Sequence, residues 1–548
     1  MAHNFSAPLE AFLYWEKEAP NNIYLQQPFD GSLKEYSYKK VGVEARKIAQ
    51  YLKDLNLPPK SHIALISKNC AHWIMADLAI MMSGHISIPI YPTLNAESIR
   101  QILEHSESKA IIVGKLDFYE KQRAGIPDIP IIGIEAYGVQ EDLSWEQLVK
   151  KIDELSNLAR HTSEDLHTII YTSGTTGTPK GVMHTVRNVM TSINTLKNIL
   201  ILPSTPRFFS FLPLAHVAER QIMTYGLTLG ACIRFPESLA TFAADLEATQ
   251  PHAFFAVPRI WTKFQEKIVD TIGRKRLKLL LKIPFLNKLI KSKLQEKLGL
   301  KHANIILSAA APLAKEVIDW YTKLDIEILQ VYGMTEDCCI SHFNMPNANK
   351  VGTVGKALPG VDIKFSEEGE ILIKNKCLMK GYYKAPEMTA EVMDKDGFFH
   401  TGDLGEYDHD GFLSIIGRAK DQFKTDKGKY ISPAPIELLL EDEPVIEQVC
   451  VVGTGIPQPI GLVVISEVGS RMNKSELIKA LEDAIQKVNP GFEKHEYLEK
   501  LVVMKEQWTV DNGLLTPTLK VRRNRIEKIH QEYYKSWFKE SDKIVFEV

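Results

Sequence analysis

The sequence predicts an α/β protein: a large N-terminal part with doubly wound sheets and a small β region, then a small α+β C-terminal part. Three observations support this. Short β-branched runs alternate with helical patterns as far as residue 309, which favours a parallel, doubly wound sheet. Near residue 355, Pro-Gly and Glu-Gly turns separate short strands. The balance of 45% hydrophobic and 24% charged residues is that of a globular protein.

The expected strands of the large part are short and rich in Ile, Val and Phe, as buried strands are. A helical spacing of apolar residues at 44–55 precedes the first of them. The strand-like runs fall at 62–67, 86–91, 110–114, 167–173, 207–214, 231–235, 252–258 and 303–309.

The C-terminal part has a different sequence pattern. The segment 354–375 predicts antiparallel strands, and the Asp-Gly pair at 410–411 predicts a hairpin turn. Beyond this turn lie helical patterns and strand-like runs at 435–443, 448–455, 462–468, 474–488 and 499–506. This compact set predicts a boundary near Arg418, with a large domain at 1–417 and a small domain at 418–548.

Composition excludes several classes of protein. The 66 Lys and Arg residues against 68 Asp and Glu residues give a net charge of −2, whereas a dedicated nucleic-acid binder needs a basic excess. The first ten residues lack the basic head and apolar run of a signal peptide, and no apolar run reaches the ~18 residues of a spanning helix. The six cysteines form no Cys-x-x-Cys pair, so we expect reduced thiols and a cytoplasmic protein.

The strongest functional motif is YTSGTTGTPKG at 171–181, directly after an expected strand. Its glycines let the backbone approach a ligand closely, and backbone N–H groups with hydroxyls form a concave anion site. Lys180 adds a positive charge for a polyphosphate. The motif is not a P-loop, because Lys180 follows Pro179 and precedes Gly181. The candidate phosphate-binding residues are Thr172, Ser173, Gly174, Thr175, Thr176, Gly177 and Lys180.

This motif resembles the signature loop of the AMP-forming adenylating enzymes, which include acyl-CoA synthetases, luciferases and nonribosomal adenylation domains. Further motifs follow in the family's order, so the resemblance spans nearly the whole chain. It implies an ATP-binding enzyme with mixed sheets in the large domain and a small, mobile C-terminal domain.

The second motif, VYGMTE at 331–336, brings together an aromatic ring, a hydroxyl and a carboxylate. Tyr332 offers its face to a purine, and Thr335 offers a hydroxyl to a phosphate. Glu336 offers a hard oxygen ligand to Mg²⁺. The resemblance makes all three residues part of the ATP site.

The third motif is HTGDLGEYDHDGFLSIIGRAKD at 400–421. The resemblance assigns Asp403 to the ribose hydroxyls, a task that suits a carboxylate because it accepts two hydrogen bonds. It also assigns Arg418 to ribose or phosphate and Lys420 to the hinge between the domains. Asp408 and Asp410 have the setting of a hairpin turn.

The fourth motif, LTPTLKVRRNRI at 515–526, matches Lys520 to the family's catalytic lysine. A cation there stabilises the charge that develops as a carboxylate attacks the α-phosphate. Leu519 stands where many relatives have glycine, and the TPTxK pattern is similar to the bacterial long-chain fatty acyl subgroup. A solvated basic tail is the alternative, because Arg522 and Arg523 follow.

Three further segments, 211–220, 256–264 and 423–437, resemble long-chain acyl-CoA synthetases. In the family, the position of His216 lies beside the substrate carboxylate. The segment that contains Ala310 lines the adenine and acyl pockets. Gly428 matches the turn that lines the CoA channel, although Lys427 replaces the first of two glycines common in relatives.

The resemblance implies an ATP-dependent long-chain fatty acid–CoA ligase that uses Mg²⁺. Such an enzyme forms acyl-AMP and pyrophosphate, then acyl-CoA and AMP after the small domain rotates. Three alternatives remain open: an acyl-AMP ligase that loads an acyl carrier protein, a ligase for an aryl or branched carboxylate, and a non-catalytic nucleotide-binding protein.

A local basic segment, 274–302, contains ten Lys and Arg residues and one acid, Glu296. Leu286, Leu289, Ile290 and Leu294 fall near one helical face, interrupted by Lys293. A basic amphipathic stretch of this kind can lie on an anionic membrane, here at the inner face, and an ordinary solvated helix has the same pattern.

Overall fold

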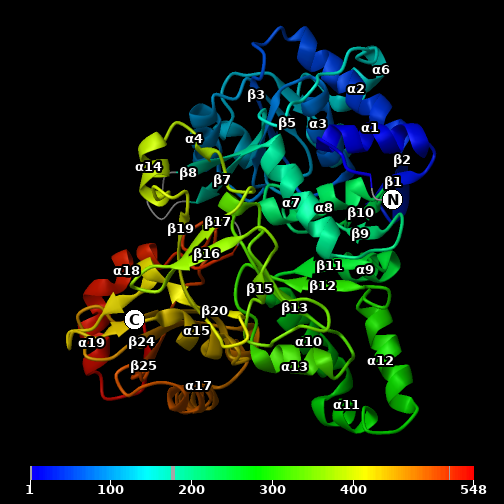
Figure 1. The fold of residues 1–548 in the computed structure, drawn as a ribbon. Helices are drawn as coiled ribbons and strands as arrows, with labels where there is room; N and C mark the ends of the chain where they lie inside the picture. The colour runs from blue at the N-terminus through cyan, green and yellow to red at the C-terminus, as the bar shows by residue number, and fades with distance from the viewer. Residues whose placement is uncertain (1–2, 174–178, 517–518, 548) are drawn as a thin grey trace.

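Two large sheets form most of the N-terminal part of the molecule (Figure 1), whose computed structural model describes residues 3–173, 179–516 and 519–547. The first sheet has seven strands in the order β18-β8-β7-β4-β3-β5-β6. Its central strands are parallel, and β8 pairs antiparallel with both β7 and β18. The strands are β3 (His62–Ile66), β4 (Ile86–Ile90), β5 (Ala110–Val113), β6 (Ile131–Gly133), β7 (Leu166–Ser173), β8 (Pro179–Thr185) and β18 (Gly381–Tyr382).

The second sheet has nine strands in the order β15-β14-β13-β12-β11-β9-β10-β1-β2. It is parallel from β13 to β1 and antiparallel at both edges. The strands are β1 (Ile23–Phe29), β2 (Ser32–Ser37), β9 (Arg207–Phe209), β10 (Cys232–Arg234), β11 (Ala253–Ala256), β12 (Ile305–Ser308), β13 (Leu329–Tyr332), β14 (His342–Phe343) and β15 (Lys356–Ala357).

A layer of helices lies between the two sheets and shares one core with both. Its centre is α3, the most apolar stretch of the chain, which is buried along its whole length and contacts β3, β4 and β1. Asp77 of this helix is buried with Arg220, whose Nη2 lies 2.6 Å from the carboxylate. The helices of this layer are α1 (Pro8–Glu18), α2 (Tyr38–Asp54), α3 (Ala71–Met82), α6 (Trp145–Lys151), α7 (Val186–Ile199) and α8 (Val217–Thr228).

The outer faces of both sheets are also covered. The helices α4 (Ala96–Ser106) and α5 (Tyr119–Gln122) pack on the seven-stranded sheet. Five helices pack under the nine-stranded sheet: α9 (Phe242–Thr249), α10 (Pro258–Ile272), α11 (Arg274–Leu280), α12 (Leu286–Lys297) and α13 (Lys315–Thr322). The large part therefore has five alternating layers of helix and sheet, which buries both faces of each sheet.

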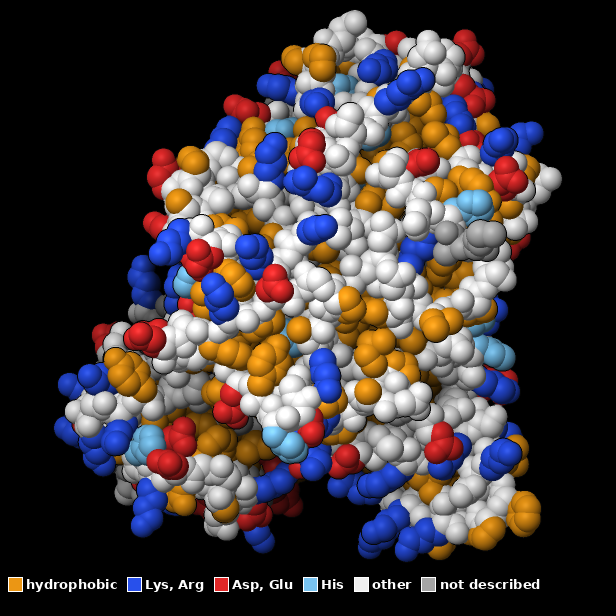
Figure 2. Space-filling view, viewed as in Figure 1, with side chains coloured by type: hydrophobic (Ala, Val, Ile, Leu, Met, Phe, Trp, Pro, Cys, Tyr) orange, Lys and Arg blue, Asp and Glu red, His pale blue; other side chains and the backbone are white. Residues whose placement is uncertain are grey.

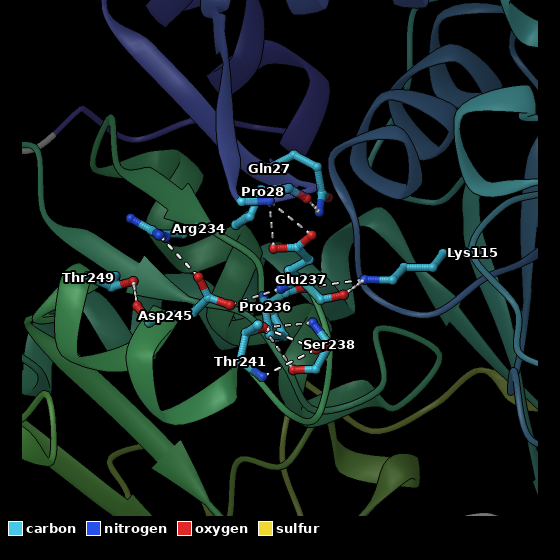
Figure 3. A network of polar contacts seen from close by, with 11 residues as sticks. Gln27, Pro28, Lys115, Arg234, Pro236, Glu237, Ser238, Thr241, Asp245 and Thr249 are labelled. Carbon is cyan, nitrogen blue, oxygen red and sulfur yellow. Dashed lines mark hydrogen bonds and ion pairs between the residues drawn. The ribbon is translucent and has the colours of Figure 1, made fainter.

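A polar network joins the two sheets where their strands end (Figure 3). Lys115, just beyond β5, donates from Nζ to the carbonyl of Pro236, 3.2 Å away, and to that of Glu237, in the loop after β10. Asp245 of α9 holds the same loop, because it accepts from the N–H of Glu237 and pairs with Arg234 at 3.1 Å. These contacts fix one sheet relative to the other.

A small antiparallel sheet, β16-β17-β19-β20, follows the nine-stranded sheet in the chain. The Asp-Gly hairpin predicted at 410–411 joins its last two strands, and Asp408 accepts from the N–H groups of Asp410 and Phe412. Its elements are β16 (Asp362–Phe365), β17 (Glu370–Lys374), α14 (Pro386–Val392), β19 (Phe399–Tyr407) and β20 (Leu413–Arg418).

The C-terminal part has its own sheet, β23-β24-β25-β26, and a short hairpin of β21 and β22. Two hydrophobic clusters, drawn only from residues between 423 and 546, pack against this sheet. The elements are β21 (Phe423–Lys424), β22 (Tyr430–Ile431), α15 (Pro433–Glu441), β23 (Ile446–Val452), β24 (Ile460–Ile465), α16 (Glu467–Ser470), α17 (Lys474–Val488), β25 (Lys500–Val503), α18 (Arg523–His530), α19 (Tyr534–Lys539) and β26 (Ile544–Phe546).

The predicted fold class is confirmed, and each strand-like run predicted between 62 and 309 contains a strand. The sheets are mixed, because antiparallel strands are added at their edges. The division at 417 and 418 stays a prediction. None of the helices formed by the described residues is both long and apolar enough to cross a bilayer.

Candidate active site

A cavity of about 2110 Å³ lies between the large sheets and the C-terminal part, which contributes Thr516 and residues 519–525 to its wall. Residues at the ends of β7, β11, β12 and β13 line it, which is the usual place for a ligand in α/β sheets. The predicted site residues on its wall are Thr172, Lys180, His216, Ala310, Tyr332, Thr335, Glu336, Asp403, Arg418, Lys420 and Lys520. Gly174, Thr175, Thr176, Gly177 and the side chain of Ser173 lie outside the described residues.

Asp403 is anchored by two partners on this wall. It stands opposite Arg418 in the β19–β20 pair, and Arg418 Nε lies 2.9 Å from Asp403 Oδ1. The hydroxyl of Tyr332 donates to Asp403 Oδ2 over 2.7 Å. Asp403 also raises the pKa of Arg418 above its ordinary value. The result is a buried, oriented carboxylate with lone pairs left for a ligand's hydroxyl groups.

Lys520 closes a tight turn on the opposite, C-terminal wall. Leu519 and Lys520 donate their N–H groups to the carbonyl and Oγ1 of Thr516, at 2.8 and 3.0 Å. Leu519 has φ of +63°, in the left-handed region that most side chains avoid. Lys520 is exposed and lines the cavity, so a ligand can reach its side chain.

Lys520 lies close enough to Arg418 and Asp403 for their charges to act on it. Burial and the charge of Arg418 lower the pKa of the Lys520 ammonium, while Asp403 and Cys339 act in the opposite direction. Lys520 also contributes to the lowered pKa of His216. The C-terminal lysine therefore acts on groups of the large sheets within one cavity, as expected of a lysine that faces the substrate.

The β7–β8 hairpin carries the phosphate motif. Thr172 and Lys180 stand opposite each other at the end of the hairpin. The Nζ of Lys180 lies 5.4 Å from the centre of the Tyr382 ring, a cation–π contact. The Tyr382 hydroxyl in turn donates to Glu336 Oε1 over 2.8 Å. Tyr382 therefore links the lysine of the first motif to the carboxylate of the second.

Thr335 and Glu336 are fixed through their backbone. The Thr335 carbonyl accepts from Nε2 of His184 over 2.7 Å, and the Glu336 carbonyl accepts from the N–H of Met379 over 2.7 Å. Burial lowers the pKa of His184 to about 4, so this ring is a neutral donor at pH 7. Both side chains are left to face the cavity.

His216 caps the first turn of α8, where its Nδ1 accepts from the N–H of Ala218 over 3.1 Å. Burial, together with Lys520, lowers the pKa of His216 to about 4. A neutral ring that accepts at Nδ1 carries its proton on Nε2. His216 is therefore an oriented N–H donor on the cavity wall.

Ala310 has φ of +76° just beyond β12. A non-glycine residue in this region is strained, and such strain gathers at functional sites. The small side chains of Ala309, Ala310 and Ala311 line the cavity at this point and leave room against the backbone.

Part of the cavity wall is formed by apolar residues of the core between the two sheets, and we call this part the apolar arm. These residues are Leu196, Leu200, Ile222, Tyr225, Phe255 and Leu307. These side chains come from α7 and the residue that follows it, from α8 and from the strands of the nine-stranded sheet. The arm offers hydrocarbon contact, and His216 and Ala309 line the same cavity.

Lys420 lies on the cavity wall in the short segment Ala419–Asp421 that joins β20 to the C-terminal part. Gly428 lies elsewhere, in the turn between β21 and β22, where it has φ of +76° and donates to the carbonyl of Thr425. That turn is not part of the cavity wall. The structure thus brings Lys520 to the cavity and leaves Gly428 outside it.

Comparison with known families accounts for this arrangement. The model described as "AMP-binding enzyme" matches residues 13–383, more than half of the chain. The protein belongs to the AMP-binding enzyme family. A second model, "AMP-binding enzyme C-terminal domain", matches residues 420–542 of this family member.

Curated relatives of this AMP-binding enzyme cover almost its whole length. It is 28% identical over 582 residues to "Fatty acyl-CoA synthetase B" of Dictyostelium discoideum, covering 93% of this chain and 86% of the relative. It is 28% identical over 563 residues to "Long-chain-fatty-acid--CoA ligase FadD15" of Mycobacterium bovis, covering 93% of each chain.

Solved structures share the fold. The A domain of a carboxylic acid reductase from Segniliparus rugosus has a TM-score of 0.79 at 20% identity, covering 97% of this chain and 94% of that one. An o-succinylbenzoate CoA synthetase from Bacillus subtilis has a TM-score of 0.74 at 19% identity, covering 94% of this chain and 97% of that one. At these identities the likeness concerns the fold.

Sequence reasoning missed two residues of this AMP-binding enzyme's site, Tyr382 and His184. Tyr382 reaches Glu336 only because β18 pairs with β8, from which it is separated by about two hundred residues. The weak signal for it was the aromatic pair in GYY at 381–383. His184 follows the phosphate motif by three residues, and a lone histidine in a strand gave no reason to single it out.

Proposed function

We propose that the protein is an ATP-dependent ligase that converts a long-chain fatty acid into its CoA thioester through an acyl-AMP. The observation that carries this proposal is a single cavity that joins the Asp403–Arg418–Tyr332 cluster, Lys520 and an apolar arm. The two relatives named above carry fatty acyl-CoA synthetase and ligase names, and this chain covers most of their length.

In this proposal Asp403 accepts hydrogen bonds from the ribose hydroxyls of ATP, and Arg418 holds that carboxylate in place. Tyr332 and the alanines beside Ala310 flank the adenine. The phosphate motif, with Thr172, Lys180 and the residues outside the described part of the chain, binds the β- and γ-phosphates. Thr335 presents its hydroxyl to a phosphate.

Glu336 would hold Mg²⁺. Among the described residues no group of three His, Cys, Asp or Glu side chains could hold a metal by itself. This fits Mg²⁺, which commonly binds one or two carboxylates and takes its other ligands from phosphates and water. Tyr382 keeps the Glu336 carboxylate in position. When bound, Mg²⁺ neutralises phosphate charge.

The first step is adenylation. A carboxylate oxygen of the fatty acid forms a bond to the α-phosphorus of ATP, and the bond from that phosphorus to the bridging oxygen breaks, so that pyrophosphate leaves. Lys520 donates to the phosphoryl oxygens as negative charge concentrates there. The Nε2–H of His216 orients the carboxylate, and the apolar arm takes the acyl chain.

The second step is thioester formation. The CoA sulfur, after loss of its proton, attacks the acyl carbon, the bond from that carbon to the phosphate oxygen breaks, and AMP leaves. We propose that residues 418–548 rotate as a unit about Lys420 between the steps. The separate hydrophobic clusters beyond residue 423 and the position of Gly428 outside the cavity support two arrangements.

We place the enzyme in the cytoplasm, with peripheral contact to the inner face of a membrane through 274–302. Long-chain fatty acids partition into bilayers, so an enzyme that acts on them gains from such contact.

The test is pyrophosphate release over short, long, branched and aryl carboxylic acids, with and without CoA. We expect release with long-chain acids and a thioester only when CoA is present. Acyl transfer to a carrier protein but not to CoA would indicate the acyl-AMP ligase. Preference for an aryl or branched acid would show that the substrate is not a long-chain fatty acid. Absence of pyrophosphate–ATP exchange with every acid would indicate a non-catalytic nucleotide-binding protein.

A further inference from the structure

The hairpin of α11 and α12 projects from the large part (Figure 1). Its free end carries exposed apolar side chains. We call residues 278–289 the tip. The exposed fraction is 63% for Leu279, 40% for Ile283, 94% for Phe285 and 53% for Leu289. Figure 2 shows hydrophobic and basic side chains side by side at this end of the molecule. Single exposed apolar residues are ordinary, but four within eleven positions are not.

The predicted amphipathic face of 286–294 is wrong as a membrane-facing surface. Leu294 is buried and Ile290 is half-buried, and both pack in the core beneath the nine-stranded sheet. Only Leu289 of that face is strongly exposed. The helical stripe therefore anchors the hairpin to the protein and leaves its free end as the accessible apolar surface.

The charged side chains of the hairpin also differ between its base and its tip. At its base, Lys291 pairs with Asp325 and Lys297 with Glu247, both at 2.8 Å. At the tip, Lys278, Lys282 and Lys288 are exposed, and no acid among the described residues lies within 4 Å of them. The exposed apolar side chains are thus surrounded by cations without an intramolecular partner of this kind.

Phe285 strengthens the case for an external partner. Its φ of +66° lies in the left-handed region, where a bulky side chain is strained. Its ring is nevertheless almost wholly exposed and makes no ring contact with a described residue. The chain thus holds an aromatic side chain outward at a conformational cost and gains no packing from it.

We propose that the tip docks on an anionic bilayer, with Leu279, Ile283, Phe285 and Leu289 inserted at the level of the headgroups. Lys278, Lys282 and Lys288 then meet lipid phosphates. Apolar side chains ringed by unpaired cations match a surface that is hydrophobic inside and negative outside. The proposal deepens the membrane contact by naming its side chains and its lipid charge, and binding itself does not depend on the ligase reaction.

The tip is connected to the cavity through two consecutive helices. The helix α10 runs directly into α11 through Gly273, and its side chains Thr262, Glu266 and Asp270 line the cavity. The tip is therefore joined through α11 to a helix that forms one wall of the cavity.

The experiment is flotation of the full-length protein with two kinds of vesicle. One is phosphatidylcholine alone, and the other contains roughly a third phosphatidylglycerol. We expect binding to the second kind, weakened by high salt. The triple variant Lys278→Gln, Lys282→Gln, Lys288→Gln should lower affinity on the order of a hundredfold, from about fivefold per lysine. The double variant Leu279→Ser, Phe285→Ser keeps the charge and should lower affinity about tenfold or more.

Matched controls separate the tip from general effects. Leu239 is 94% exposed elsewhere, so Leu239→Ser should bind as the wild type does. The same holds for Lys39→Gln, Lys109→Gln, Lys151→Gln, which removes three exposed lysines away from the tip. A Phe285→Trp variant should shift its emission to shorter wavelength when anionic vesicles are added, which reports insertion in a folded protein.

Three outcomes would overturn the proposal: no flotation of the wild type with anionic vesicles, equal loss in the controls, or a dimer that the tip variants disrupt without any vesicle binding. Pyrophosphate release from detergent-dispersed substrate, measured in the same tip variants, should be unchanged. A failure of the ligase function would appear in that assay for the wild type and leave the flotation result intact.

Discussion

Arg418 and Asp403 face each other across an antiparallel strand pair, with 2.9 Å between Nε and Oδ1, and Arg418 is the last residue of β20. Lys420 follows two residues later in the segment that leads to the C-terminal part. The ion pair at the proposed ribose site is therefore almost contiguous with the proposed hinge. Rotation about Lys420 would begin beside the ion pair that we propose to bind the ribose.

Replacement of Asp403 by asparagine should weaken the use of ATP. Each hydrogen bond to a charged acceptor contributes about 1.5–3 kcal/mol, so loss of the carboxylate should lower kcat/KM for pyrophosphate–ATP exchange by about a hundredfold or more. Asp410→Asn, in the exposed hairpin turn, is the matched control. Equal activity of the two variants would show that Asp403 does not bind ATP.

Replacement of Lys520 by alanine should separate the two steps. Adenylation should fall by about 10²–10³-fold, the range for loss of one donor to a developing oxyanion. Thioester formation from supplied acyl-AMP should stay within a few-fold of the wild type. The exposed Lys528 in α18 provides the control Lys528→Ala. Equal losses in both assays would contradict the role in adenylation alone.

The strained backbone at Leu519 predicts an order among substitutions. Leu519→Gly should keep adenylation, because glycine adopts φ of +63° without strain. Leu519→Val should lower it, because a β-branched residue disfavours this conformation and would move the turn that carries Lys520. Pyrophosphate exchange and thermal unfolding report the two effects. Similar behaviour of the valine and glycine variants would show that the turn tolerates either.

Buried histidines should make the protein less stable in mild acid. Burial lowers the pKa of His342 from 6.5 to about 4, so below pH 6.5 the unfolded chain binds a proton that the folded chain does not. The free energy of unfolding should fall between pH 6.5 and 4, by up to about 2 kcal/mol per such histidine at pH 5. His184 acts in the same direction.

Urea unfolding at pH 7 and pH 5 measures this dependence. His342→Asn should flatten it, since one proton-linked group is removed. His409, whose side chain is 85% exposed, gives the control His409→Asn, which should leave the dependence unchanged. The prediction fails if the His342 variant keeps the full pH slope.

The sequence predicted those features that reside in one contiguous segment. Runs such as 62–67 and 110–114 are short, apolar and β-branched, so their burial follows from composition alone. Asp403 and Arg418 stand in one hairpin, where local pairing brings them together.

Features that depend on distant segments could not be predicted. The link from Lys180 through Tyr382 to Glu336 requires three elements of the chain to meet. The face of α12 that carries Ile290 and Leu294 had the right helical period, but periodicity cannot say whether its partner is a lipid or a protein core. The roles of the site residues remain predictions that the variants above test.

The pairing of β18 with β8 has a consequence for synthesis on the ribosome. One edge of β8, next to the phosphate motif, stays unpaired until Gly381 and Tyr382 of β18 have been synthesised. At about 5–20 residues per second, the nascent chain needs on the order of ten to forty seconds to grow from one strand to the other. During that interval an unpaired strand edge is open to aggregation, and a chaperone that shields it would improve the yield of folded protein.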